Sequence, residues 1–107
     1  MAIEKVREYF SQSGLADRIL EFDVSSETVE LAAQAIGCEE KQIAKSMSFL
    51  LHDQAILVVT SGDARISNPK FKEQFKTKAK MIPPDQVENL IGHDVGGVCP
   101  FGIHEDV

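Results

Sequence analysis

The chain has 107 residues, of which 43% are hydrophobic and 26% charged, the proportions of one ordinary globular domain. It has neither an apolar run near the roughly 20 residues of a membrane span nor the layout of a signal peptide. The net charge of −6 argues against a surface that is basic throughout and binds nucleic acid. The two cysteines form no CxxC pair, which indicates a reduced, cytoplasmic protein.

The first third of the chain is predicted to contain two helices and a short strand. Apolar residues at three- and four-residue spacing predict a helix over residues 3–13. Residues 18–24 alternate between apolar and polar side chains, as a strand does. Ser25 or Ser26 can cap a second helix with Glu27 in its first turn, and an apolar stripe runs along that helix up to a terminating glycine.

The most informative segment is the strand predicted at residues 43–51, after one helical turn at 39–42. Period two places Lys45 among four large apolar residues on one face. The other face carries mostly small groups, from Ala44, Ser46, Ser48 and Leu50. Because burying an unpaired ammonium is costly, Lys45 either extends to the end of the strand or points into a polar pocket and holds an anion.

The second half of the chain is predicted to add a hairpin partner and two helices. The β-branched run at residues 55–60 is typical of a central strand that is buried on both faces. Helices are expected to start at Asn68-Pro69, with two phenylalanines turned inward, and at Pro83-Pro84. A short strand at residues 78–82 is expected between these two helices.

Residues 65–80 form a basic segment in an otherwise acidic chain. The segment has a charge of +5, whereas the remainder carries −11. Its cations are Arg65, Lys70, Lys72, Lys76, Lys78 and Lys80. Such a segment can attract a phosphate-rich partner, or it can be the solvated face of a lysine-rich helix.

Residues 92–102 contain four glycines and one proline between β-branched residues. This composition predicts either a backbone bend that a ligand approaches closely or a tight turn without a ligand. His93, Cys99 and His104 lack the paired spacing of a closed metal site, so no metal and no other cofactor is expected. Cys99 with His93 can be a thiol nucleophile and its base, or simply a small core residue.

The segments Ile43-Ala44-Lys45-Ser46-Met47-Ser48-Phe49, Gly62-Asp63, Asn68-Pro69-Lys70-Phe71 and 92–102 occur in an order that resembles the YbaK family. These are free-standing aminoacyl-tRNA deacylases similar to the editing domain of bacterial prolyl-tRNA synthetases. The resemblance implies an α+β fold with a curved, mostly antiparallel, barrel-like sheet flanked by helices. It also implies hydrolysis of mischarged tRNA, most often tRNA for proline that carries cysteine or alanine.

The resemblance further implies which residues form the site. Lys45 matches a strand lysine that holds the 3′-terminal adenosine, and Gly96, Gly97 and Pro100 belong to a GxxxP loop whose backbone lies against the aminoacyl group. Residues expected to line the substrate site are Ser46, Met47, Gly62, Asp63, His93, Val98, Cys99, Phe101 and Gly102. The basic segment is expected to bind the tRNA acceptor stem. Backbone N–H groups then stabilise the oxyanion without a protein nucleophile.

Family members usually continue for several dozen residues beyond the glycine-rich loop, whereas this chain ends at Val107. We therefore expect one editing domain over residues 1–107 that lacks the C-terminal part, with an open sheet edge through which two copies can pair. Two functions remain open at this point. One is a trans-editing deacylase, with a synthetase as a further partner, and the other is a binding module of the same fold that recognises an aminoacyl or nucleotide end without turnover.

Overall fold

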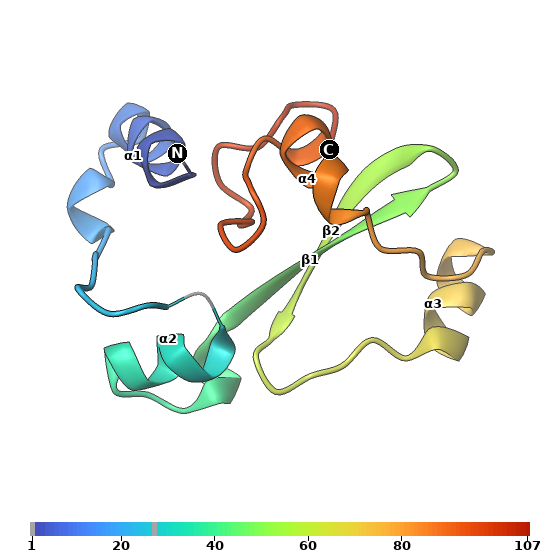
Figure 1. Ribbon diagram of the computed structural model, residues 1–107, viewed down its shortest axis with the longest axis horizontal. Helices are drawn as coiled ribbons and strands as arrows, with labels where there is room; N and C mark the ends of the chain where they lie inside the picture. The colour runs from blue at the N-terminus through green and yellow to red at the C-terminus, as the bar shows by residue number, and fades with distance from the viewer. Residues whose placement is uncertain (1, 27) are drawn as a thin grey trace.

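The computed structural model describes residues 2–26 and 28–107, so the predicted position of Glu27 in a first helical turn lies outside the described residues. The elements, drawn in Figure 1, are α1 (Ala2–Gln12), η1 (Ala16–Arg18), α2 (Val29–Ile36), η2 (Glu40–Gln42), β1 (Ala44–Leu51), β2 (Gln54–Ser61), α3 (Asn68–Phe75) and α4 (Pro84–Ile91), where η marks a 3-10 helix. The mixed α+β class predicted from the sequence is confirmed. None of the helices in this described part is long and apolar enough to cross a membrane.

The hairpin β1–β2 crosses the middle of the molecule (Figure 1). The strands are antiparallel, with Lys45 opposite Thr60 and Leu51 opposite Gln54. A two-residue turn joins them, and its residues His52 and Asp53 have φ values of 50° and 66°. Short hairpins favour turns of this left-handed kind because their twist matches that of the strands. The predicted hairpin is therefore confirmed.

β1, and not β2, is the strand with neighbours on both sides. Along its second edge, the N–H of Leu50 donates to the Lys80 carbonyl (2.8 Å) and the N–H of Ile82 donates to the Ser48 carbonyl (3.2 Å). The strand expected at residues 78–82 is thus reduced to a single bridge between Phe49 and Met81. Within the described residues β2 pairs with β1 alone, and Val59 is 48% exposed. The prediction of a central strand at residues 55–60 was wrong, because a β-branched run does not show what covers it.

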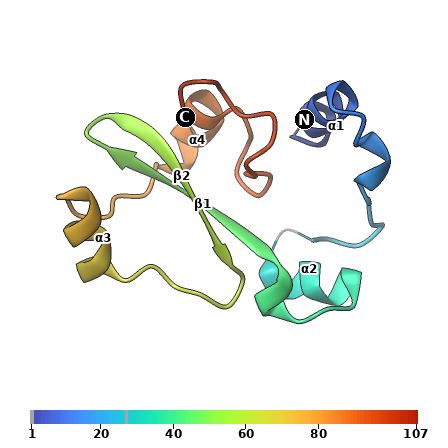
Figure 2. The same ribbon diagram turned by 180° about the vertical axis from the view of Figure 1, so that it is seen from behind.

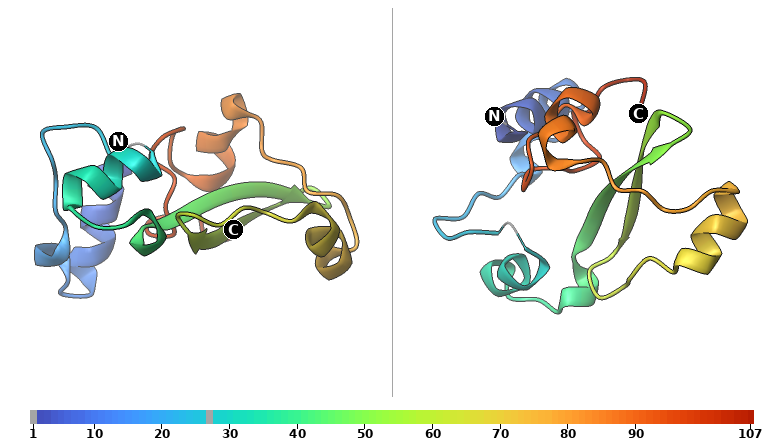
Figure 3. Two further views of the ribbon diagram at one scale, coloured as in Figure 1. Left: turned by 90° about the horizontal axis from the view of Figure 1, so that it is seen from below. Right: turned by 45° about the vertical axis from the view of Figure 1, so that its right-hand side comes forward.

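The two faces of β1 pack against different helices. On one face, the Phe49 and Phe71 rings lie 5.1 Å apart and the Phe71 and Phe75 rings 4.6 Å apart, which confirms the inward phenylalanines of α3. On the other face, a buried cluster forms from Ala55, Ile82, Val87 and Ile91, with Leu50 packed against it. Figure 3 shows α3 and α4 on opposite sides of the hairpin. Period-two alternation therefore gives β1 one aromatic side and one side of small residues.

The N-terminal helix α1 packs against the chain that follows α4, and Figure 2 shows the two segments side by side. The rings of Phe10 and Phe101 meet edge to face, with centroids 4.7 Å apart, and Tyr9 lies 5.9 Å from Phe101. Lys5 Nζ also donates to the Gly92 carbonyl. Aromatic contacts thus hold the glycine-rich segment in place from behind.

Two local predictions near the N-terminus were wrong. Residues 19–24 form neither helix nor strand, and Leu20 is 71% exposed. Alternation alone cannot make a strand where no neighbouring strand accepts its hydrogen bonds. The cap of α2 is Thr28, whose Oγ1 accepts a hydrogen bond from the N–H of Leu31 (3.1 Å), and neither Ser25 nor Ser26 is the cap.

Candidate functional site

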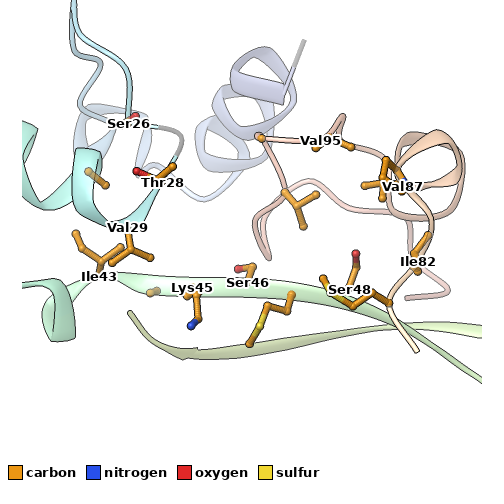
Figure 4. A pocket seen from close by; sticks show the side chains of 17 residues that line it. Ser26, Thr28, Val29, Ile43, Lys45, Ser46, Ser48, Ile82, Val87 and Val95 are labelled. Atoms are coloured by element: carbon orange, nitrogen blue, oxygen red, sulfur yellow. The ribbon is translucent and has the colours of Figure 1, made fainter. Parts of the chain in front are cut away.

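A cavity of about 390 Å³ lies between the small-residue face of β1, the start of α2 and the loop at residues 95–98 (Figure 4). Its walls are largely apolar and include Val29, Ile43, Ile82, Val87 and Val98. The space exists because the side chains of Ala44, Ser46 and Ser48 are too small to fill the distance between β1 and the loop. The small-residue face noted in the sequence is therefore the floor of the cavity.

The glycine-rich loop contributes Val95, Gly96 and Val98 to the cavity. Gly96 has a φ of 91°, a left-handed conformation that strongly favours glycine, so this turn depends on the residue type. The N–H of Gly97 donates to the Asp94 carbonyl (3.0 Å) and is occupied within the loop. The N–H groups of Val95, Gly96 and Val98, by contrast, have no acceptor among the described residues. These three residues line the cavity, so their N–H groups are the candidate loop donors for a ligand.

Two serine hydroxyls rise from β1 into the cavity, as Figure 4 shows for Ser46 and Ser48. Ser48 is only 6% exposed, yet its hydroxyl has no hydrogen-bond partner in the described part of the chain. The hydroxyl is not among the fully enclosed atoms, so it opens onto the cavity. Ser48 was not predicted as a site residue, although it shares its strand face with Ser46, which was. That shared face was the signal that could have identified it.

The Lys45 side chain leaves β1 on the side opposite to the two serine hydroxyls (Figure 4). Lys45 belongs to the cavity lining, but its Nζ donates to the carbonyl of Ala64, next to Arg65 at the start of the basic segment. The ammonium thus extends past the end of the hairpin where β1 begins and β2 ends, and it does not enter the cavity. It binds the loop that follows β2.

His93, Cys99 and Phe101 form a cluster behind the loop and do not line the cavity. His93 is 1% exposed, and its Nε2 donates to the Phe101 carbonyl (2.6 Å). Cys99 Sγ also donates to this carbonyl (3.4 Å) and lies 3.7 Å from His93 Nε2. Because Nε2 carries the proton in this bond, it cannot accept one from the thiol. Burial raises the pKa of the Cys99 thiol, although its bond to Phe101 lowers it, so the reactive thiolate is disfavoured.

Gly62 and Asp63 lie in the turn after β2 and are not among the residues that line the cavity. A Cβ on Gly62 would lie 2.2 Å from the Glu40 carbonyl oxygen and 2.6 Å from Val29 Cγ1. Asp63 Oδ1 accepts a hydrogen bond from Ser61 Oγ (3.0 Å). The turn is therefore explained by its packing against η2 and α2.

The basic segment at residues 65–80 contains α3, which lies on the side of the hairpin opposite α4 (Figure 3). Lys70, Lys72 and Lys76 are exposed there, as are Lys78 and Lys80 beyond the helix. A second hollow of about 500 Å³ is lined by Asn68, Pro69, Lys72, Lys78 and Ala79. The cations are thus accessible to a large anionic partner.

Of the predicted site residues, the structure brings Lys45, Ser46, Met47, Gly96 and Val98 together at the cavity. Gly97, Pro100 and Gly102 belong to the same chain segment but do not line it. The lining residues that were not predicted are Ser26, Thr28, Val29, Ala32, Ile43, Ala44, Ser48, Met81, Ile82, Pro84, Val87 and Val95. Within residues 2–26 and 28–107, no group of three or more His, Cys, Asp or Glu side chains is placed to hold a metal ion.

Comparison with known proteins identifies the family of this chain. The aminoacyl-tRNA editing domain family matches residues 24–107, and the chain belongs to that family. The resemblance to the editing region of prolyl-tRNA synthetases is thereby confirmed. The matched range begins just before α2 and contains the whole of the hairpin, α3, α4 and the glycine-rich loop.

Individual relatives agree with this assignment. The uncharacterized protein YwhH of Bacillus subtilis is 46% identical over 107 residues, which are 99% of this chain and 68% of that protein. The proline–tRNA ligase of Lactiplantibacillus plantarum is 26% identical over 81 residues, which cover 75% of this chain and 14% of the ligase.

A solved structure of a chain proposed to be a trans-editing enzyme for prolyl-tRNA synthetase aligns with a TM-score of 0.83 at 30% identity. The alignment covers 96% of this chain and 66% of that one. The chain therefore spans about two thirds of the length of its Bacillus relative and of this structural neighbour.

Proposed function

We propose that the protein hydrolyses mischarged aminoacyl-tRNA in trans and that the aminoacyl group occupies the cavity beneath the loop at residues 95–98. The observation that carries the proposal is the pairing of this cavity with three loop N–H groups that have no acceptor among the described residues, those of Val95, Gly96 and Val98, in a chain of the editing family. Backbone donors of this kind stabilise the negative charge that develops on an ester carbonyl during hydrolysis.

The chemistry needs little more than positioning, because an aminoacyl ester is already activated. The loop holds the carbonyl and a water molecule attacks it, so that binding in the correct geometry supplies much of the rate. Pro100 is exposed and has no N–H to donate, so its role is to restrict the backbone of the loop. Gly97 acts in the same way, since its N–H is already bonded to Asp94.

The tRNA itself lies along the basic segment. The Lys45 ammonium, which is bonded to the Ala64 carbonyl, binds a phosphate of the acceptor end, because it faces away from the space for the amino acid. The exposed lysines of α3 contact the acceptor stem through phosphates, in a manner that weakens with salt. Electrostatic attraction thus binds the tRNA, and the fit of the amino acid to the cavity determines which ester is hydrolysed.

The edited amino acid is small and uncharged. The cavity walls are largely apolar, and among the described residues that line them there is no Asp or Glu side chain to neutralise a cationic side chain. tRNA for proline that carries cysteine or alanine is the substrate that this space and the resemblance to prolyl-tRNA synthetases favour together.

One observation favours a second function, a binding module that recognises an aminoacyl end without hydrolysing it. No imidazole, carboxylate or thiol is among the described residues that line the cavity, and the Lys45 ammonium faces away from it, so none of these residues supplies a general base there. Release of free amino acid from mischarged tRNA for proline separates the two functions. A deacylase releases it at a rate proportional to protein concentration, whereas a binding module protects the ester or leaves its decay unchanged.

Partners and location follow from the same proposal. The protein acts in the cytoplasm, where aminoacyl-tRNA is used, with a synthetase as a possible source of its tRNA. The edge of β2 that is unpaired among the described residues can join the same edge of a second copy. Sedimentation over a concentration series tests this dimer, and a monomer at all concentrations would contradict it.

A further inference from the structure

Ser48 is a largely buried residue of the cavity lining whose hydroxyl opens onto the cavity and has no hydrogen-bond partner among the described residues. Its hydroxyl points toward the space under Val87 and Val95 (Figure 4), and Ser48 is 6% exposed. No described residue bonds to this hydroxyl, although the Ser48 carbonyl accepts from the N–H of Ile82. The main chain is therefore fixed while the hydroxyl remains available.

The surroundings of this hydroxyl are otherwise apolar. Ile82 and Val87 are 4% and 5% exposed, and both line the same end of the cavity as Ser48 in Figure 4. A hydroxyl can donate one hydrogen bond and accept two, and it is neutral. A group that binds here must therefore be small and largely apolar, with one neutral atom that hydrogen-bonds.

We infer that Ser48 is a specificity-determining residue and that the cavity prefers amino acids whose short side chains carry a hydroxyl or thiol. The inference rests on the proposed editing function and narrows its substrate class. The side-chain hydroxyl or thiol of the amino acid hydrogen-bonds to Ser48 Oγ, and its methylene packs against Ile82 and Val87. A methyl group fits the same space but makes no hydrogen bond with the Ser48 hydroxyl, so alanine is bound less well.

The size of the preference follows from a single neutral hydrogen bond. Such a bond changes an equilibrium or a rate by roughly three- to tenfold. The large discrimination of a fully desolvated polar site is not expected, because the cavity is open to solvent and water can replace the substrate at Ser48. The effect is nevertheless well within the range of a kinetic comparison.

The test compares wild type with Ser48→Ala on tRNA for proline charged with cysteine, serine or alanine. The wild type is expected to hydrolyse the cysteinyl and seryl esters about three- to tenfold faster than the alanyl ester, after correction for uncatalysed hydrolysis. Ser48→Ala is expected to remove this difference while the alanyl rate changes less than twofold. Ser13→Ala, which removes an exposed hydroxyl remote from the cavity, is the matched control and should behave as wild type.

A binding measurement keeps the inference testable if the protein proves not to be an enzyme. Calorimetry with non-hydrolysable seryl- and alanyl-adenosine amides should show the same preference in wild type and its loss in Ser48→Ala. The inference is overturned if Ser48→Ala slows all three esters equally, or if the preference is absent or survives the substitution. If no ester is hydrolysed but the seryl amide still binds more tightly through Ser48, the deacylase function fails and the specificity stands.

Discussion

Substitution of Gly62 by alanine tests whether the turn after β2 serves packing rather than substrate binding. The new Cβ would lie 2.2 Å from a backbone oxygen, that of Glu40, and 2.6 Å from Val29 Cγ1. The carbonyl cannot rotate away as a side chain can, so the turn and η2 must separate. Overpacking of this kind costs about 1–3 kcal/mol, and the lower entropy of the unfolded alanine chain offsets less than 1 kcal/mol.

We therefore expect Gly62→Ala to lower the free energy of unfolding by about 2 kcal/mol, or the thermal midpoint by about 10 °C. Asp63→Ala is the matched control, because it removes only one exposed hydrogen bond and should cost less than about 0.5 kcal/mol. Urea and thermal denaturation followed by circular dichroism measure both. The packing explanation would be refuted if Gly62→Ala were as stable as wild type. Loss of affinity for an aminoacyl-adenosine amide in such a stable variant would point instead to a role of the turn in substrate binding.

Three further predictions follow from the site. Lys45→Ala should lose most tRNA deacylation while its thermal midpoint stays near that of wild type, and unchanged turnover at subsaturating tRNA would exclude the phosphate-binding role. Cys99→Ala should keep most activity, whereas a loss of about a thousandfold would indicate a thiol nucleophile. Burial raises the pKa of the Cys99 thiol, so the stabilisation that the protonated thiol contributes is fully present below the ordinary thiol pKa and is lost as the pH rises through the folded-state pKa. The free energy of unfolding of Cys99→Ala should therefore lack this decrease at alkaline pH. Neutralising Lys70, Lys72 and Lys76 together should reduce the slope of log affinity for tRNA against log salt concentration by up to about three units. Hydrolysis of a short aminoacyl-adenosine ester, which lacks the stem, should remain nearly unchanged. If the triple variant binds tRNA as wild type does, these lysines are only a solvated helix face.

The sequence predicted those elements whose boundaries are encoded locally. Ser67 caps α3 and Pro69 stands in its first turn, so α3 begins where the sequence indicates, and α4 begins at Pro84 and is terminated by Gly92, as its proline and glycine indicate. The two faces of β1 were also predictable, because alternation is a property of the strand itself. The predicted strand at residues 18–24 shows the limit of this reasoning, since a strand needs a partner that no local pattern supplies.

The site was located correctly in sequence but only partly in space. The glycine-rich loop does border the cavity at Gly96, yet His93 and Cys99 a few residues away point behind it. In an irregular loop, side-chain directions depend on individual φ and ψ values, which composition does not reveal. The direction of Lys45 followed from alternation with Ser46, but which face of β1 borders the cavity required the positions of α2 and α4.

The most direct test of the account is to map where an aminoacyl end binds. Titration of the ¹⁵N-labelled chain with a non-hydrolysable aminoacyl-adenosine amide reports every backbone amide by its chemical shift. We expect the largest changes at Gly96, Val98 and Ser48, with little change at Asp63 or in α1. Saturable changes centred on the turn at Gly62 and Asp63, with the amides of the loop at residues 95–98 unmoved, would contradict the assignment of this cavity as the editing site.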